Sequence, residues 1–179
     1  APTPGTGSGG YGLFVGRLSP EKGLGTVLEA WETLGAKIPL KIAGDGPLAP
    51  MVKAATEKGP GVEWLGRRPL SEIYELMGEA SFLVFSSEWY ETFGRVAIEA
   101  FAKGTPVVAA NIGAIAELVT PMKTGLHFQP GNTASLIEQV EWALSHPDAM
   151  QQMRIEARSE FEEKYTAPSN YQRLMEIYN

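Results

Sequence analysis

The sequence predicts an α/β fold, in which a Rossmann-like parallel sheet carries helices on both faces. Three observations lead to this prediction. Short apolar runs alternate with longer segments whose apolar residues recur at helical spacing. The chain has 179 residues, a length that suits one well-filled domain. Glycines and charged residues gather directly after the apolar runs, where a parallel sheet of this kind binds its ligands.

The expected strands are six short apolar runs. They cover residues 13–15, 40–43, 62–65, 82–85, 106–109 and 126–128. The segments between them carry helix-spaced apolar residues, in four series that begin at Leu24, Ile73, Val96 and Leu136. Continuous apolar runs are typical of strands that are covered on both faces. We therefore expect the four series to be the faces with which helices cover the sheet.

The first ten residues, 1–10, are Ala, Pro, Thr, Gly and Ser, with nothing large to bury. This composition predicts a flexible linker, followed by one domain over residues 11–179. A domain that starts with a linker is expected to come from a longer chain. At the other end, an expected last helix at about residues 168–178 carries an apolar stripe of Tyr171, Leu174, Met175 and Tyr178.

Composition excludes several classes of protein. The net charge of -6 argues against nucleic acid or an anionic membrane as the main partner. The absence of cysteine removes disulfides and thiolate chemistry, and the two histidines are too far apart in sequence to suggest a metal site. There is neither a long apolar run nor a signal peptide, so the expected location is cytoplasmic.

The first candidate motif is GRLSPEKG, residues 16–23, directly after the first expected strand. Gly16 allows a tight turn, and Arg17 and Lys22 flank a loop that leads into a helix. Two cations and free backbone N–H groups at a helix start would suit a diphosphate. The alternative is a solvated loop in which both cations pair only with Glu21 or with water.

The second candidate motif, GDGP at residues 44–47, follows the second expected strand. Gly44 and Gly46 permit a close approach of the backbone to a ligand, while Pro47 suits the first turn of a helix. The motif therefore indicates either the lining of a ligand cleft or a purely structural turn with a helix cap.

The third motif, SEWYETFGRVAIEA at residues 87–100, carries two carboxylates. Glu91 precedes a helix that is expected to start near Phe93, and Glu99 follows on that helix. Carboxylate oxygens accept hydrogen bonds from sugar and ribose hydroxyls, while the amides of Phe93 and Gly94 at the helix start would face an anion. The alternatives are an exposed loop acid at Glu91 and an ion pair between Glu99 and the residue one turn earlier.

Taken in order, these motifs and the run KGTPVV at residues 103–108 resemble the C-terminal, donor-binding domain of the retaining glycosyltransferases of family 4. The similarity extends from about Gly12 to the end of the chain. The resemblance implies one half of a two-domain GT-B architecture and a UDP-, GDP- or ADP-sugar donor. UDP or GDP is the expected nucleotide, and no cofactor is expected beyond this substrate.

The resemblance also implies roles for single residues. Arg17 and Lys22 would hold the donor diphosphate, and Glu91 would accept from hydroxyls of the transferred sugar. Phe93 and Gly94 would lie near the sugar or phosphate, and Glu99 would accept from the ribose. The family's base site corresponds to the loop that contains Arg67, with a solvated turn as the alternative. The chain departs from the family at Ile112, where a glycine is expected beside Gly113, which is kept as a donor-binding candidate.

In the resembled enzymes a second, N-terminal domain supplies the acceptor site. We therefore expect this chain to bind a nucleotide sugar without transferring it. Any association with a membrane would come through that second domain. The apolar stripe near the end of the chain, which would normally contact that domain, predicts self-association or fraying of the last helix.

Two other interpretations compete with this one. Gly10, Gly12 and Gly16 suggest the fingerprint of an NAD-dependent dehydrogenase, but that fingerprint follows the first strand, whereas these glycines bracket it. The other interpretation is a non-catalytic domain that binds a sugar nucleotide or acts as a scaffold, and it remains open. The transferase interpretation requires the two acids and the two cations to face one shared pocket.

Overall fold

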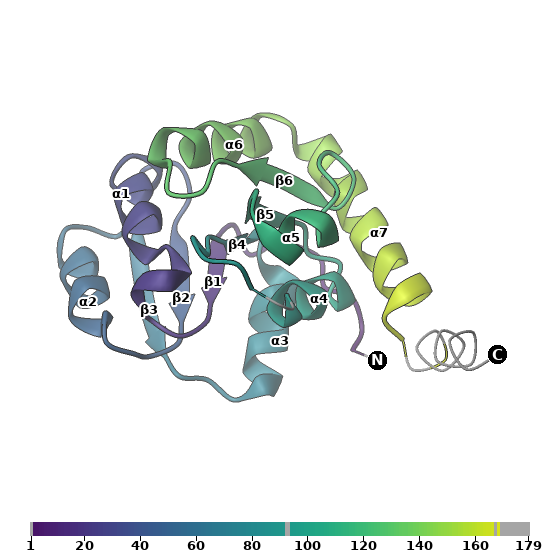
Figure 1. Cartoon of the computed structure of the whole chain (residues 1–179), viewed down its shortest axis with the longest axis horizontal. Coiled ribbons are helices and arrows are strands. Elements are labelled where there is room, and N and C mark those ends of the chain that lie inside the picture. Colours follow the sequence, from purple (N-terminus) through teal and green to yellow (C-terminus); the bar gives the residue numbers. More distant parts are fainter. Residues whose placement is uncertain (1, 92–93, 167, 169–179) are drawn as a thin grey trace.

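The computed structural model describes residues 2–91, 94–166 and 168. Its centre is a six-stranded parallel sheet with the order β3-β2-β1-β4-β5-β6 (Figure 1). The strands are β1 (Gly12–Val15), β2 (Leu40–Ala43), β3 (Val62–Gly66), β4 (Phe82–Phe85), β5 (Val107–Ala110) and β6 (Gly125–Phe128). All six match the predicted runs to within a residue or two. The chain moves outward from β1 to β3 and then returns to β4 beside β1, so the strand order reverses between β1 and β4, where open sheets bind ligands.

Helices cover both faces of the sheet, as the sequence predicts. The helices are α1 (Leu24–Leu34), α2 (Ala49–Glu57), α3 (Leu70–Glu79), α4 (Arg95–Ala102), α5 (Gly113–Leu118), α6 (Thr133–Ser145) and α7 (Pro147–Lys164), with a short 3-10 helix η1 (Pro20–Lys22) before α1. Buried side chains of α1, α2 and α6 form one core, and those of α3, α4 and α5 form the other.

Neighbouring residues of a strand enter different cores, as the pleat requires. In β4, Phe82 and Val84 face the core of α1 and α6, while Leu83 and Phe85 face the core of α3 and α4. All four side chains are buried, which explains why the strand reads as one continuous apolar run. One predicted core position is wrong, because Leu144 at the end of α6 is 38% exposed.

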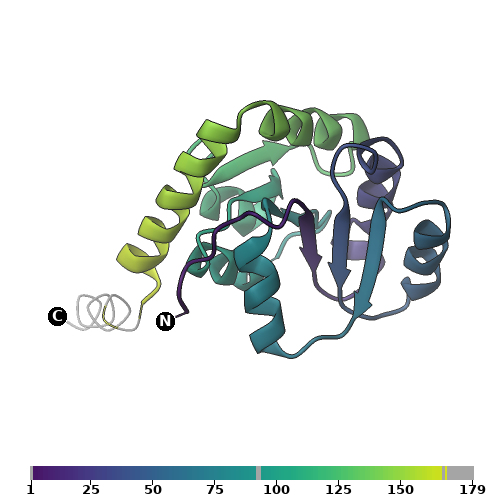
Figure 2. The ribbon, with the colours of Figure 1, turned by 180° about the vertical axis from the view of Figure 1, so that it is seen from behind.

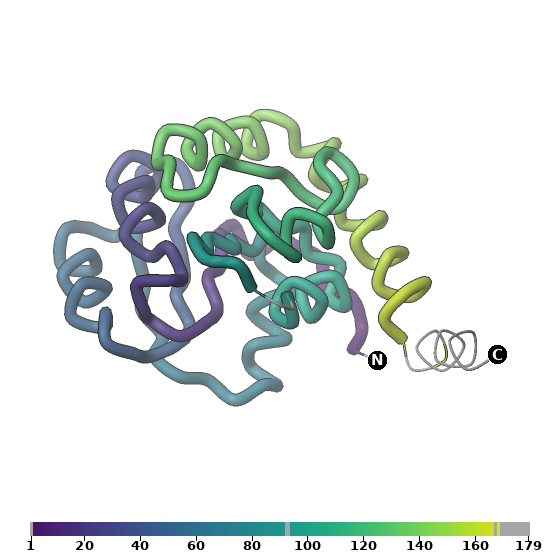
Figure 3. Tube along the Cα trace, viewed as in Figure 1, coloured from purple at the N-terminus to yellow at the C-terminus, as the bar shows by residue number. Residues whose placement is uncertain are grey.

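The last helix with described bounds joins the two layers. The trace in Figure 3 follows α6, which packs against α1, into α7, which packs against α4. Met150 and Met153 of α7 belong to the core of α1 and α6, whereas Ala157 and Phe161 belong to the other. The helix therefore crosses from one face of the sheet to the other. No described helix is long and apolar enough to span a membrane.

The chain before β1, residues 2–10, lies along the domain and is called the N-terminal strap. Figure 2 shows it, in purple, running from the end of α7 to the start of β1. Gly5, Gly7 and Gly9 donate backbone hydrogen bonds to the carbonyls of Lys103, Gly78 and Glu79 at 2.8–3.0 Å. The composition of this segment gave no indication of these contacts. Its role as a linker in a longer protein stays a prediction.

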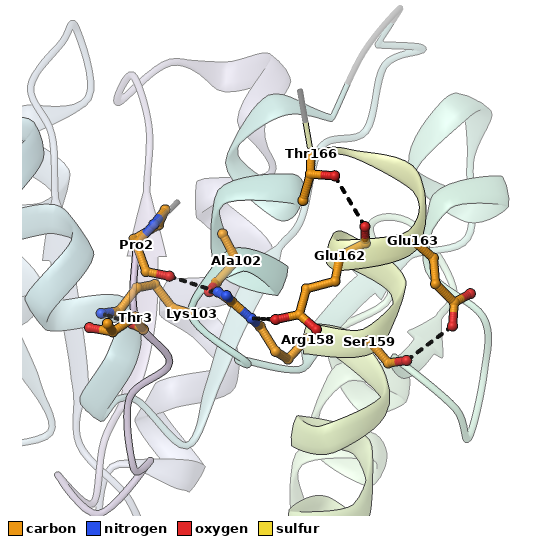
Figure 4. Close-up of polar contacts among 9 residues, drawn as sticks. All are labelled: Pro2, Thr3, Ala102, Lys103, Arg158, Ser159, Glu162, Glu163 and Thr166. Atoms are coloured by element: carbon orange, nitrogen blue, oxygen red, sulfur yellow. Dashed lines mark hydrogen bonds and ion pairs between the residues drawn. The ribbon is translucent and has the colours of Figure 1, made fainter. Parts of the chain in front are cut away.

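Side chains fasten the strap at both ends. Near its start, Arg158 of α7 donates to the carbonyls of Pro2 and Ala102, and buried Lys103 donates to the carbonyl of Thr3 (Figure 4). Farther along the strap, the hydroxyls of Thr6 and Ser8 donate to the carboxylate of Glu79 at the end of α3. These contacts tie the entry of the chain to α3, α4 and α7.

Candidate functional site

A pocket of about 600 Å³ lies at the carboxyl ends of β1, β2 and β3. It is lined by Val15, Gly16, Arg17, Ala43, Gly44, Asp45, Gly46, Arg67, Arg68 and Ile73. Five of the predicted site residues are among them: Gly16, Arg17, Gly44, Gly46 and Arg67. The pocket therefore lies at the edge of the sheet where parallel folds of this class bind ligands.

Two glycine-containing loops meet at the floor of the pocket. A Cβ built on Gly44 would lie 1.9 Å from the carbonyl oxygen of Gly16, so no other residue fits there without moving the backbone. The indole of Trp64 donates to the carbonyl of Gly44 at 3.0 Å and fixes this turn from the β3 side. Gly44 is thus required for the close packing of the first two loops, which supports the structural interpretation of the turn as well as its place in the pocket lining.

Positive charge dominates the side chains of this pocket, although the whole chain is acidic. Arg17, Arg67 and Arg68 are exposed at its rim, and Asp45 is the one acid in the lining. Arg68 is held by the carbonyl of Leu65 at 2.9 Å. The side chains of Arg17 and Arg67 make no hydrogen bond or ion pair with any of the described residues. Two guanidinium groups are therefore available to an anion.

The second cation of the first motif lies against the third motif. The ammonium of Lys22, at the end of η1, forms an ion pair with Oε1 of Glu91, in the loop between β4 and α4. Both side chains are largely shielded from solvent, with 29% and 21% of their surface exposed. This is neither the solvated loop nor the pairing with Glu21 that the alternative interpretation required for Lys22. The structure thus brings a predicted phosphate-binding group and a predicted sugar-binding group into contact.

Several further contacts join these two loops. The hydroxyl of Ser86 donates to the carbonyl of Lys22 at 2.6 Å, and the backbone of Glu88 donates to that of Glu21 at 3.0 Å. Gly23 has a φ of 69°, and a Cβ there would lie 1.9 Å from the carbonyl oxygen of Ser86. The start of α1 can approach the end of β4 this closely only because residue 23 is a glycine.

Hydrogen bonds also favour the ionised form of Glu21 in the first loop. The Ser19 hydroxyl, followed by the Glu21 backbone, lowers the pKa of Glu21 below its ordinary value. The hydroxyl donates to Oε1 of that carboxylate at 2.7 Å. Glu21 therefore stays ionised and is turned toward its own loop.

The helix α4 begins at Arg95, with Gly94 buried at its N-cap, one or two residues later than the sequence predicts. Phe93 lies outside the described residues. Glu99 is 16% exposed and accepts from the guanidinium of Arg95 at 3.1 Å, so the alternative ion pair is present. Of the two acids and two cations that were expected to face one pocket, only Arg17 lines it, because Lys22, Glu91 and Glu99 are not among its lining residues.

The start of α5 approaches the loop that carries Glu91. Gly113 has a φ of 62°, and a Cβ there would lie 3.2 Å from the ring of Tyr90 and 3.7 Å from the backbone nitrogen of Glu91. Ile112, the departure from the family pattern, is the N-cap of α5. Tyr90 and Trp89 themselves are 82% and 68% exposed, so Trp89 stands in solvent in this structure.

Both histidines have structural partners. His127 contacts the carbonyl of Val119 through Nε2 at 2.7 Å. His146, the C-cap of α6, contacts the carbonyl of Trp142 through Nδ1 at 2.8 Å. Across residues 2–91, 94–166 and 168, no group of three or more acids or histidines is arranged to hold a metal ion.

The contact between Ser87 and Glu91 was not predicted from the sequence. The hydroxyl of Ser87 donates to Oε1 of Glu91 at 2.7 Å, the same oxygen that Lys22 contacts. The signal available in the sequence was a hydroxyl two residues after a strand and four residues before a candidate acid. That spacing is too common in loops to single out a residue.

Known proteins share this fold and are similar to this chain in sequence. The structure of Anabaena Alr3699/HepE in complex with UDP superposes with a TM-score of 0.81 at 23% identity, covering 95% of this chain and 49% of that one. The catalytic domain of cholesterol-alpha-glucosyltransferase from Helicobacter pylori superposes with a TM-score of 0.77 at 23% identity, covering 88% of this chain and 99% of that one. The fold is therefore the Rossmann-like type that occurs in glycosyltransferases.

The family follows from the sequence comparisons. The model of the family "Glycosyl transferases group 1" matches residues 9–160, so the chain belongs to this family. Glycogen synthase of Mycobacterium tuberculosis is 35% identical over 152 residues, which make up 82% of this chain and 36% of that enzyme. The chain thus spans little more than a third of the length of this relative.

Proposed function

We propose that this chain is the donor-binding domain of a retaining glycosyltransferase of family 4, placed as the C-terminal half of a GT-B enzyme. It binds a nucleoside-diphosphate sugar, with UDP or GDP as the expected nucleotide. The observation that carries the proposal is the cationic pocket at the ends of β1 to β3. The ion pair of Lys22 and Glu91, which is not part of the pocket lining, joins the loops that follow β1 and β4. The similarity to Alr3699/HepE, solved with UDP, supports the same choice of ligand.

The chemistry follows from the charges. Transfer of the sugar leaves a nucleoside diphosphate, whose negative charge must be stabilised as it develops. Arg17 is free to meet this charge, and Lys22 can bridge to it, because an ammonium has three N–H donors and Glu91 uses one. Glu91 accepts from a hydroxyl of the sugar, and Glu99 from the ribose if its contact with Arg95 opens.

The acceptor site belongs to a second domain in this proposal. The relatives are longer than this chain, which spans 36% of the glycogen synthase and 49% of the Alr3699/HepE chain. The isolated chain therefore binds a donor without transferring its sugar. A non-catalytic domain that binds sugar nucleotides would bind in the same way, and the two functions differ only when the second domain is supplied.

The test is calorimetric titration of the chain with UDP, GDP and ADP and with their glucose or mannose esters, together with a donor-turnover assay. Arg17→Ala should weaken binding of the preferred nucleotide about tenfold or more, since a hydrogen bond to a charged group contributes roughly 1.5–3 kcal/mol. Its melting temperature should not change, because the Arg17 side chain is exposed and unpaired among the described residues.

Lys53→Ala is the matched control, since it removes the same charge from the exposed surface of α2. It should leave the affinity unchanged. An Arg17→Ala variant with a lowered melting temperature and an unchanged affinity would assign Arg17 a structural role. Robust sugar transfer by the isolated chain would contradict the need for a second domain, and the absence of binding to every nucleotide tested would overturn the proposal.

A further inference from the structure

Ser87 is a buried hydroxyl at the edge of the proposed site. It is the second residue after β4, is 2% exposed, and donates to Oε1 of Glu91 at 2.7 Å. Among the described residues its side chain has no other hydrogen-bond partner. The neighbouring Ser86 differs, because its hydroxyl donates to the backbone of the Lys22 loop. The contact with Glu91 is therefore what the Ser87 hydroxyl contributes.

The two oxygens of the Glu91 carboxylate have different surroundings. Oε1 accepts from both Ser87 and Lys22, while Oε2 has no partner among the described residues. A carboxylate oxygen that is already shared by two donors is a poor acceptor for a third. The free oxygen is the one able to accept from a ligand.

The two donors also differ in what else they can bind. Lys22 is a flexible cation that can share its three N–H donors between Glu91 and a bound diphosphate, so it holds Glu91 less firmly once a nucleotide is bound. Ser87 is neutral and buried, so a diphosphate does not draw it away. Once a nucleotide is bound, Ser87 is the donor that still fixes the rotamer of Glu91.

We infer that Ser87 is a positioning residue, which holds Glu91 with Oε2 directed to a hydroxyl of the sugar on the bound nucleotide. This inference rests on the proposed function. It assigns Ser87 to recognition of the sugar and not of the nucleotide. The quantity that Ser87 controls is the ratio of the affinity for a nucleotide sugar to the affinity for the corresponding nucleoside diphosphate.

A double-mutant cycle tests the inference. Calorimetry gives the affinity ratio of UDP-glucose to UDP, and of GDP-mannose to GDP, for the wild-type chain, Ser87→Ala, Glu91→Ala and the double variant. Ser87→Ala should lower the ratio for the preferred pair about three- to tenfold, with the diphosphate affinity within about twofold of wild type. Glu91→Ala should lower it at least as much, and the double variant should match Glu91→Ala, because Ser87 acts only through Glu91.

Further variants separate positioning from packing. Ser87→Thr keeps a hydroxyl and should keep most of the wild-type affinity ratio. Ser87→Cys keeps the size of the side chain but has only a weak donor, so its ratio should match that of Ser87→Ala. The cysteine variant therefore replaces Ser87→Ala if the alanine variant does not fold. Thr105→Val is the matched control, because it removes a buried hydroxyl that donates to the carbonyl of Met77. It should lower the melting temperature and leave the ratio unchanged.

The outcomes distinguish this inference from the proposed function. Additive losses in the cycle, an unchanged ratio in Ser87→Ala and Ser87→Cys, or an equal loss for diphosphate and nucleotide sugar would each overturn the role of Ser87. A ratio that is insensitive to Glu91→Ala would overturn it as well and leave nucleotide binding intact. A wild-type chain that binds neither kind of ligand would overturn the proposed function together with the inference.

Discussion

Glu79 shows how one side chain can stabilise a segment that looks unstructured in sequence. Its carboxylate, at the end of α3, accepts from the hydroxyls of Thr6 and Ser8 in the N-terminal strap at 3.0–3.1 Å. The hydrogen bond from Ser8, followed by that from Thr6, lowers the pKa of Glu79 below its ordinary value of 4.5. The ionised carboxylate is therefore the form that the folded chain prefers.

This preference predicts how stability depends on pH. Because the folded pKa is lowered, the contribution of Glu79 is present above about pH 4.5 and is lost as the pH falls through the lowered value. The free energy of unfolding in urea should be higher for the wild-type chain than for Glu79→Gln at pH 7. This difference should shrink toward pH 3. Glu75→Gln, an exposed change on the same helix, is the control and should show no such trend. A pH-independent difference would mean that the charge of Glu79 does not matter.

Residues of the candidate site were predictable to different degrees. Arg17 and Gly44 could be placed at one edge of the sheet, because each directly follows a recognisable strand. The contact between Lys22 and Glu91 could be expected only as proximity, since 69 residues separate the pair in sequence. Ser87 could not be predicted, because its role depends on which rotamer the acid four positions later adopts.

The N-terminal strap is the element whose sequence and structure differ most. Glycines at alternate positions, 5, 7 and 9, suggested flexibility, but each approaches another part of the chain too closely for a side chain. A Cβ on Gly5 would lie 2.2 Å from the backbone of Gly78, and one on Gly7 would lie 2.5 Å from the guanidinium of Arg154. These partners are about 70 residues or more away in sequence, so no local pattern reveals them.

A glycine substitution in the strap therefore tests its packing. Gly5→Ala should lower the free energy of unfolding by about 1–3 kcal/mol, the usual cost of overpacking, because the clash is with backbone that cannot rotate away. Gly25→Ala is the matched control, since Gly25 lies at an exposed position of helix α1 with nothing within 4 Å of an added Cβ. It should be neutral or stabilise by about 0.5–1 kcal/mol. Equal small effects in urea unfolding would mean that the strap is loosely held.

The main elements were predictable because strand burial and helix periodicity are local properties. β4 reads as a strand since all of its side chains are buried, and α1 reads as a helix since its buried residues recur on one face. The exposed Leu144 shows the limit, because an apolar residue at helical spacing also occurs on the outer edge of a helix. The strand order β3-β2-β1-β4-β5-β6 follows from the alternation of strands and helices only as one of several possible orders.

At the scale of the whole molecule, the net charge of the chain and the charge around the pocket have opposite signs. The chain carries a net charge of -6, yet three arginines surround the pocket at the ends of β1 to β3. Binding of an anion must then depend on short-range contacts, because the chain as a whole repels it. The same net charge opposes contact between two copies of the chain, and this bears on the apolar stripe predicted near its end.

The stripe Tyr171, Leu174, Met175 and Tyr178 lies outside the described residues. The sequence alone predicts self-association through it or fraying of the last helix, and the first of these can be tested with salt. Contact through apolar side chains is not weakened by salt, whereas repulsion between copies of net charge -6 is screened over about 10 Å at 0.1 M salt and about 3 Å at 1 M. The mass measured by light scattering should therefore rise with salt, while association through ion pairs would give a mass that falls.

Leu174→Lys should abolish the rise, because it places a charge within the stripe. Gln172→Lys adds the same charge to the same segment at a position that is not part of the stripe. It should associate at least as well as the wild type, since its net charge is closer to zero. A chain that stays monomeric at every salt concentration, or one in which both variants behave alike, would show that the stripe does not mediate contact between copies.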